Sequence, residues 1–223
     1  MAANTQEEYA EVAANAGGFM QDRQKMLTYG IIGLALAVGL YFAYKILWVG
    51  SRQTDATEQM YFAEQMFEQD SFNLALTNPG GGNKGFLAII SEYGGTPASN
   101  LSHLYAGICY LNMGQFDKAI EYLEDYSAAG DVLGISKWGA LGDAYGEKND
   151  LDKALSCYQK AVSAGNNEAM TPIYLKKVAM LSEKKNDKEA AIEAYTRLKR
   201  EFVNTQDGRD ADKYLARLGA AKK

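Results

Sequence analysis

The chain has 223 residues, which is long enough for one soluble domain beside a membrane anchor. Of these residues 47% are hydrophobic and 23% are charged, an ordinary composition for a globular protein. Its formal net charge of −5 argues against nucleic acid as a partner. Its two cysteines cannot form the disulfide framework of a small secreted domain, so composition leaves the redox compartment open.

The first predicted elements are a polar tail and a membrane helix. Residues 1–26 are polar and predict a flexible tail. Residues 27–49 are apolar, and Lys45 is the only charged residue among them. A helix of this length covers roughly 30 Å, the thickness of the hydrocarbon core of a bilayer. The acidic residues of the tail and the poor cleavage site after the stretch argue against a signal peptide, so we expect a retained transmembrane helix.

Two features of the predicted span concern its neighbours and its orientation. Ala35, Gly39 and Ala43 recur at every fourth residue and form a small-residue stripe against which a second membrane helix can pack. Two basic residues lie near each end of the apolar stretch, so the positive-inside rule does not decide the topology.

Residues 54–95 are predicted to form a helical pair that carries a glycine-rich loop. An apolar stripe that includes Phe62 and Leu74 indicates the first helix. One proline and three glycines at residues 78–83 break this pattern, and a short helix follows. We interpret this pair as a degenerate first repeat.

From residue 100 onward the sequence repeats itself. Positions of the first unit recur 35 residues later in the second: Gly107 as Gly142, Tyr110 as Tyr145, and Ala119 as Ala154. A third, degenerate unit has Ala179 at the glycine position. Periods of 20–50 residues predict a solenoid, and the small residues allow two antiparallel helices to cross closely.

The second unit resembles the tetratricopeptide repeat. It matches the main small and large positions of that repeat with Trp138, Leu141, Gly142, Tyr145, Ala154, Tyr158 and Ala161. The resemblance implies an all-α fold, in which three tetratricopeptide units over residues 100–204 form an α-solenoid after the single N-terminal transmembrane helix. Residues 207–223 are expected to form a closing helix and a tail.

No set of residues resembles an active site. His103 is the only histidine; it occupies an aromatic position of the first repeat, where packing is the expected role. Cys109 and Cys157 are expected to be buried, inert thiols. The glycine-rich loop has neither a preceding strand nor the Lys-Ser/Thr ending of a phosphate-binding loop, so we interpret it as a turn. The sequence therefore predicts a protein that is not an enzyme and needs no cofactor or metal.

The resemblance also implies a groove that binds protein segments and is lined by the first helix of each repeat. The expected lining comprises Leu101, Leu104, Tyr105, Ile108 and Asn112 in the first unit, Asp143 and Glu147 in the second, and Ile173, Lys176, Lys177 and Met180 in the third. This lining is apolar, then acidic, then basic, which favours a partner with an apolar and mixed-charge surface.

Charge is distributed unevenly beyond the apolar stretch. Residues 51–173 carry 7 basic and 16 acidic residues, whereas residues 174–223 carry 13 basic and 8 acidic ones. A solvated helical surface explains this pattern. A basic C-terminal face turned toward anionic lipid or an acidic partner explains it as well.

The layout of one amino-terminal span followed by a modest repeat domain is similar to that of the YfgM-type ancillary subunits of the bacterial Sec translocon. The segment GFLAIISEYGGTPASNLSHLYAGICYLNMGQFDKAIEYL also resembles tetratricopeptide proteins of Bacteroidota. These resemblances imply an inner-membrane protein with a cytoplasmic N-terminus and a periplasmic repeat domain, whose partners are translocon subunits, periplasmic chaperones or clients. Two alternatives stay open: a structural subunit of another envelope or secretion complex, and a cytosol-facing import receptor.

Overall fold

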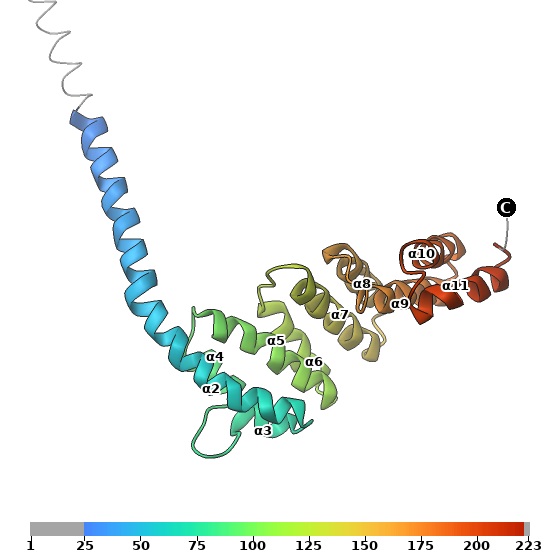
Figure 1. The fold of residues 1–223 in the computed structure, drawn as a ribbon, viewed down its shortest axis with the longest axis horizontal. Coiled ribbons are helices and arrows are strands. Elements are labelled where there is room, and N and C mark those ends of the chain that lie inside the picture. The colour runs from blue at the N-terminus through green and yellow to red at the C-terminus, as the bar shows by residue number, and fades with distance from the viewer. Residues whose placement is uncertain (1–24, 221–223) are drawn as a thin grey trace, which may run out of the picture. The chain divides into compact units, whose positions relative to one another are not determined.

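The computed structural model describes residues 25–220, which contain helices and no β-strand (Figure 1). This confirms the predicted all-α class. The chain divides into two compact units, Met1–Arg52 and Gln53–Lys223. The predicted tail, apart from Lys25 and Met26, lies outside the described residues.

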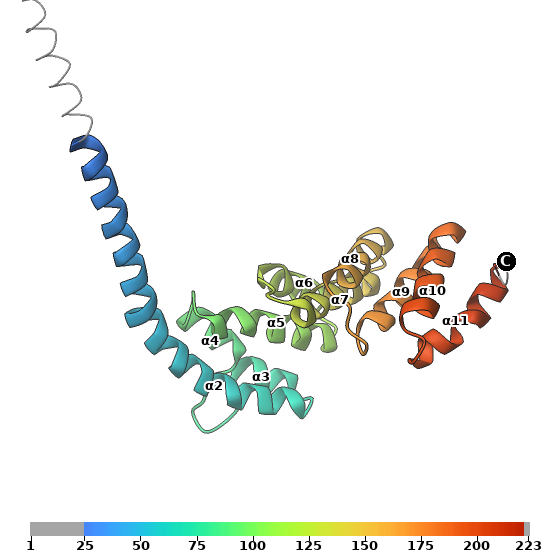
Figure 2. The same cartoon turned by 45° about the horizontal axis from the view of Figure 1, so that its top comes forward.

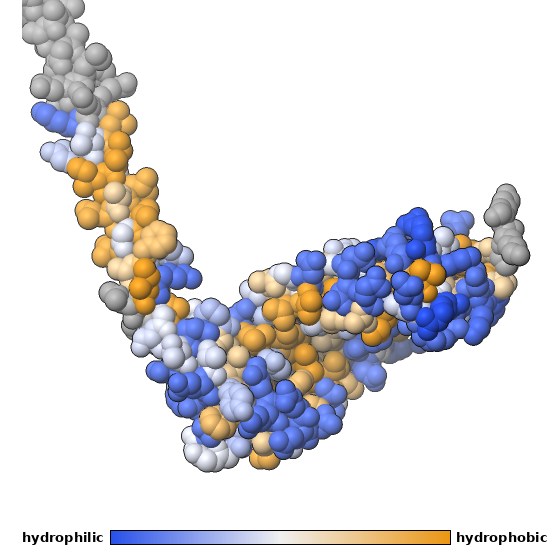
Figure 3. Space-filling model, in the orientation of Figure 1, coloured by the Kyte–Doolittle hydropathy of each residue, from blue (hydrophilic) through white to orange (hydrophobic). Residues whose placement is uncertain are grey.

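The described part of the first unit is an apolar helix. It begins at Lys25, and helical structure continues to Glu68. Large apolar side chains are exposed along it, such as Leu36 at 63% and Leu40 at 72%. Figure 3 shows the hydrophobic surface that they form. This helix is long and apolar enough to cross a membrane.

The helix does not end where the apolar stretch ends. A π-helical segment, η1 (Tyr44–Val49), follows, and at its end the N–H of Gly50 donates a hydrogen bond to the carbonyl of Lys45. The next helix, α2 (Gly50–Glu68), follows directly. No proline lies in this part of the chain to remove a backbone donor, so helical structure continues past the change of composition near residue 50, although the helix type changes at η1.

Between α2 and the first repeat the structure has two short helices, α3 (Phe72–Thr77) and α4 (Phe86–Glu92). The prediction of two helices in this region is therefore wrong, because α2, α3 and α4 make three. α2 ends early because Asp70 adopts a left-handed conformation, with φ of 53°, and the N–H of Ser71 donates to the carbonyl of Met66. The break interrupts the expected apolar stripe: Phe62 is 39% and Leu74 is 47% exposed.

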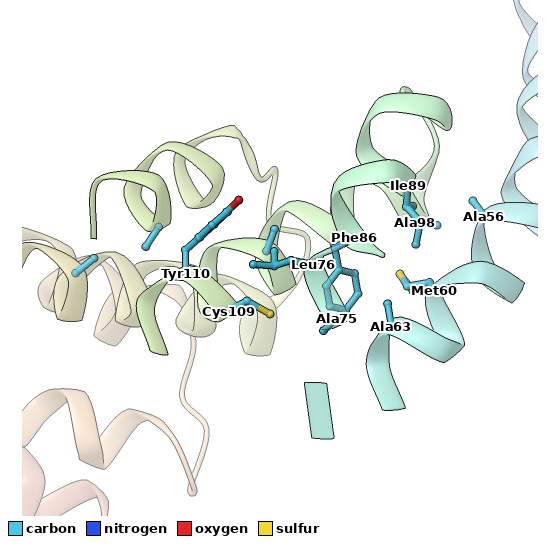
Figure 4. Close-up of a cluster of buried hydrophobic side chains, with 13 residues drawn as sticks. Ala56, Met60, Ala63, Ala75, Leu76, Phe86, Ile89, Ala98, Cys109 and Tyr110 are labelled. Carbon is cyan, nitrogen blue, oxygen red and sulfur yellow. The ribbon is translucent and has the colours of Figure 1, made fainter. Parts of the chain in front are cut away.

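These helices share a hydrophobic core with α5 (Pro97–Asn112). Met60 and Ala63 of α2 point toward Phe86 of α4, which is fully buried (Figure 4). The ring of Phe86 stacks on Tyr105 of α5 at 4.9 Å between centroids, and Phe67 meets the same tyrosine edge-on at 5.1 Å. Helices α2 to α4 therefore cover one side of α5.

The glycine-rich loop is a turn, as its composition predicts. Gly80, Gly81 and Gly82 all have positive φ, which L-residues rarely adopt. At Gly85 a Cβ atom would lie 2.4 Å from the carbonyl oxygen of Leu76, so the chain needs glycine there for a close backbone approach.

Within the described residues six helices follow α5, and the first five of them form three hairpins with it through short turns (Figures 1 and 2). The hairpins pair α5 with α6 (Phe116–Asp125), α7 (Asp131–Glu147) with α8 (Leu151–Ala164), and α9 (Thr171–Lys184) with α10 (Lys188–Glu201). The last helix, α11 (Gln206–Arg217), packs on α9 and α10. α5 begins before the predicted residue 100, because Pro97 opens it and the Thr96 side chain accepts the N–H of Ser99.

Small residues lie where the two helices of each hairpin cross. A Cβ atom on Gly107 would lie 2.5 Å from Leu123 Cγ, and one on Gly142 would lie 2.4 Å from Tyr158 Cε1. Ala179 takes this position in the third hairpin and is fully buried. The repeated glycine is thus a packing requirement.

The turns inside the three hairpins have the same backbone geometry. Gly114, Asn149 and Asn186 have positive φ of 72°, 59° and 62°. In each turn the next residue donates its N–H to a carbonyl five residues earlier, with N···O distances of 2.9 Å. Glycine and asparagine tolerate this left-handed conformation best, which explains their presence at these positions. The third hairpin is therefore built like the first two.

Candidate protein-interaction groove

A hollow of about 720 Å³ opens beside the first helices of the three hairpins. We call it the groove hollow, and its lining is Leu111, Asn112, Gly114, Phe116, Asp143, Gly146, Glu147, Tyr158 and Lys177. Four of the residues that the sequence predicted as groove lining meet here: Asn112, Asp143, Glu147 and Lys177. They come from α5, α7 and α9, one helix of each hairpin.

Asp143 is the centre of the polar contacts in the groove hollow. Its carboxylate accepts a hydrogen bond from the Tyr158 hydroxyl at 2.7 Å and forms an ion pair with the Lys177 amine. The Lys177 amine also lies 5.3 Å from the ring centroid of Tyr158 and 5.5 Å from that of Tyr174. Burial and the neighbouring Asp143 carboxylate raise the pKa of Tyr158, and they raise the pKa of Tyr174 to about 12. Both tyrosines are therefore neutral near pH 7. The surface offers carboxylates, an ammonium and aromatic edges, which suits a polar peptide better than a purely apolar one.

The apolar part of the predicted lining is used mostly for packing. Leu104 is only 4% exposed, so it is not open to a partner, and the ring of the half-buried Tyr105 packs against Phe67 and Phe86. Leu101 and Ile108 are partly buried against the core. Leu104 is therefore corrected to a core residue, whereas a groove role for Leu101, Tyr105 and Ile108 stays a prediction.

The predicted residues of α9 differ in their surroundings. Ile173 and Met180 are 47% and 54% exposed, and seven residues apart they lie on one helix face. The Lys176 amine instead lies 2.7 Å from a carboxylate oxygen of Asp207 in α11. A partner on this face of α9 would meet two apolar side chains beside a lysine that is already paired.

Comparison with family models identifies two segments of the chain. Residues 102–128 and residues 138–166 each match a model of the tetratricopeptide repeat. The first two hairpins are tetratricopeptide repeats. A comparison with curated proteins gave no significant match. Such repeats form protein-interaction scaffolds, and the hairpin of α9 and α10 extends the array with the same turn geometry.

Ion pairs connect successive hairpins of the array. Asp117 in the first turn of α6 pairs with Lys148 after α7, and Asp152 in the first turn of α8 pairs with Lys185 after α9. Much of the basic charge after residue 174 is likewise paired inside the domain, as in Arg217 with Glu183. This favours the solvated-surface explanation of the charge asymmetry, because the bases after residue 174 neutralise acids of the same array.

The small-residue stripe of the apolar helix has no neighbour within the described residues. Ala35, Gly39 and Ala43 are exposed, and a Cβ atom on Gly39 would meet nothing within 4 Å. Contact of this stripe with a second membrane helix stays a prediction.

The residues considered for chemistry take structural positions. His103 is half-buried 5.9 Å from Tyr122, and burial lowers its pKa. Its buried Nδ1 atom has no hydrogen-bond partner among residues 25–220. Residues 25–220 contain no group of three or more His, Cys, Asp or Glu side chains that could hold a metal ion.

Both thiols are expected to resist thiol reagents in the folded repeats. Burial raises the pKa of Cys109 to about 12 and also raises that of Cys157, so at pH 8 the reactive thiolate is scarce at both. Cys109 is fully buried, whereas Cys157 is 6% exposed, so Cys157 should react first. Timed labelling with a chromogenic disulfide, using Cys109→Ala and Cys157→Ala to assign the phases, checks this order. Faster labelling of Cys109 would contradict it.

Proposed function

We propose that the protein is a membrane-anchored, non-catalytic scaffold that binds protein partners through its tetratricopeptide array. The observation that carries the proposal is the groove hollow, where side chains from three hairpins converge on one open surface. The apolar helix supports the anchor, because its large side chains are exposed and need a lipid environment to be covered.

We infer that the anchor lies in the bacterial inner membrane, with the N-terminus in the cytoplasm and the repeats in the periplasm. The support is the similarity in layout to YfgM-type subunits, since basic residues are balanced across the span. Translocon subunits and periplasmic chaperones or their clients are the partners that this location implies. Protease should digest the repeats in spheroplasts, whose outer membrane is open, and should leave them intact in whole cells.

Digestion of the repeats only after lysis of the inner membrane would reverse the topology and favour a cytosol-facing receptor. Purification of the full chain in mild detergent, followed by mass spectrometry, distinguishes the partner classes. Enrichment of translocon subunits or chaperones supports the translocon role. Enrichment of a different envelope or secretion complex would replace it with the structural-subunit alternative.

The groove can be tested by exchanging the charges of one ion pair. Asp143→Lys combined with Lys177→Asp retains an ion pair but removes the Tyr158 hydrogen bond and the contacts of Lys177 with the tyrosine rings, so the free energy of unfolding should fall by about 1–3 kcal/mol and the domain should stay folded. The exchange reverses the charge pattern that a partner meets, and recovery of groove-bound partners should fall several-fold. Quantitative pull-down with the full chain measures this effect.

A matched exchange away from the hollow provides the control. Asp152→Lys with Lys185→Asp swaps the ion pair between α8 and α9 in the same way, and neither residue lines the groove hollow. Equal partner recovery with both exchanged proteins and the wild type would refute the groove as the binding surface.

A further inference from the structure

A second hollow, of about 270 Å³, lies between α6, α7 and α8, and its lining includes no residue of the groove hollow. We call it the lysine hollow, because Lys137, Lys153 and Lys160 line it together with Trp138, Ser156 and Cys157. Trp138 is one of only two tryptophans in the chain. Trp138 occupies a main position of the repeat, but the repeat pattern does not account for the three lysines beside it.

The lysines are arranged around the indole. The Lys160 amine lies 4.3 Å from the Trp138 ring centroid, and the Lys137 amine lies 5.4 Å from it. Lys153 and Lys160 are seven residues apart on α8 and so project from the same face, with Ser156 between them. The Lys153 amine lies 4.9 Å from the ring centroid of Tyr145, which also lines the hollow, so two ammonium groups and a hydroxyl of α8 face a surface that Trp138 and Tyr145 share.

The acids near the hollow leave Lys160 available. Glu124 accepts a hydrogen bond from the Tyr145 hydroxyl at 2.9 Å, and a carboxylate oxygen of Asp150 lies 3.6 Å from the Lys153 amine. The Lys137 amine donates to the backbone carbonyls of Glu124 and Tyr126, which fixes it at the end of α6. Among the described residues Lys160 has an aromatic neighbour and no ion pair within 4.0 Å. An incoming carboxylate would meet this lysine without displacing another acid.

The next junction of the array shows that the fold does not require these residues. A hollow of about 190 Å³ between α8, α9 and α10 occupies the same place one repeat further on. There Leu175 replaces Trp138, Ala190 replaces Lys153, Glu193 replaces Ser156 and Arg197 replaces Lys160. Arg197 is itself paired with Glu201 at 2.7 Å. Of these two junctions, only the first has a tryptophan in its lining and a lysine without an ion pair.

We propose that the lysine hollow binds acidic peptide segments of partner proteins, with a carboxylate held between Lys153 and Lys160 and an adjacent apolar side chain on Trp138. Charge complementarity selects this occupant, because the site is lined by three lysines and one glutamate in a stretch of chain that is otherwise strongly acidic. The volume suits one or two side chains rather than a folded surface. This second binding surface is independent of the groove hollow, so each can fail without the other.

Intrinsic fluorescence of Trp138 reports occupancy of the hollow. The Trp48→Phe background leaves Trp138 as the sole tryptophan of the full chain, which is kept in zwitterionic detergent. The probe is the amidated peptide Glu-Phe-Glu-Phe-Glu, compared with Gln-Phe-Gln-Phe-Gln. We expect a saturable change in Trp138 fluorescence with the acidic peptide and at least tenfold weaker binding of the neutral one. Raised ionic strength should weaken the acidic complex.

The matched variants separate the site from general charge. Lys153→Gln with Lys160→Gln should weaken peptide binding at least fivefold, while Lys118→Gln with Lys188→Gln removes the same charge elsewhere and should leave binding unchanged. All four positions are exposed, and circular dichroism verifies that the helices persist. Equal binding of the two peptides, equal loss in both double variants, or a response to anionic vesicles but not to the acidic peptide would overturn the proposal.

Discussion

Leu36→Arg combined with Leu40→Arg is expected to move the protein from the membrane fraction to the soluble fraction or to abolish its accumulation. Both leucines lie near the middle of the apolar helix and are exposed, so they have no protein core to lose. An arginine at the centre of a span is disfavoured by about 3 kcal/mol relative to a neutral reference, and two arginines by about 6 kcal/mol. Fractionation of membranes after carbonate extraction measures the result.

The control places the same charges on the same spacing outside the predicted span. Thr57→Arg with Tyr61→Arg alters two exposed positions of α2 and should leave the protein in the membrane fraction. If the Leu36/Leu40 variant stays membrane-bound in carbonate, residues 27–49 are not the anchor. The proposal of a membrane scaffold would then be wrong, although the repeats and their groove would be unaffected.

The architecture of the hairpins could be predicted because its causes are local. Gly107 and Gly142 recur where helices cross, and a side chain there would overlap Leu123 or Tyr158. The turns at Gly114, Asn149 and Asn186 carry a further signal in the sequence, namely residues that tolerate positive φ at repeat spacing. That signal would have supported the third hairpin, which no matched segment covers.

The elements before the repeats were predicted less well because their boundaries depend on weaker signals. Asp70 ends α2, and aspartate in a left-handed turn is far less distinctive than glycine. At residue 50 the opposite occurred: composition changed sharply, yet the backbone hydrogen bonds continued through η1 into α2. Hydropathy marks where lipid contact can end, and it does not mark where a helix ends.

The candidate site shows the same division between local and long-range information. The repeat register placed Asn112, Asp143, Glu147 and Lys177 on one surface, and the groove hollow contains all four. The repeat register could not show that helices α2–α4 pack on α5, where Phe67 and Phe86 contact Tyr105. It also missed the lysine hollow, because Trp138 reads as an ordinary repeat position until Lys153 and Lys160 of α8 are placed beside it.

Tyr195→Ala is expected to lower the free energy of unfolding of the third hairpin by about 3–5 kcal/mol. Tyr195 is fully buried, its ring stacks on Tyr214 of α11 at 4.8 Å, and its hydroxyl donates to Glu183 of α9 at 2.8 Å. The substitution leaves a cavity between three helices and removes a partner of Glu183, which also pairs with Arg217. In an array in which each hairpin contacts only its neighbours, this loss should uncouple the C-terminal helices from the rest.

Urea unfolding of the full chain in detergent tests the uncoupling with two probes. Far-UV circular dichroism should show an early loss of helix in Tyr195→Ala, while Trp138 fluorescence, which reports on the second repeat in the Trp48→Phe background, should change at higher urea. Tyr195→Phe keeps the ring and loses one hydrogen bond, so it should cost only about 1 kcal/mol and keep the two transitions together. Coincident transitions in Tyr195→Ala would mean that the three hairpins unfold as one unit, because coupling between neighbouring hairpins would then exceed the energy removed with the tyrosine ring.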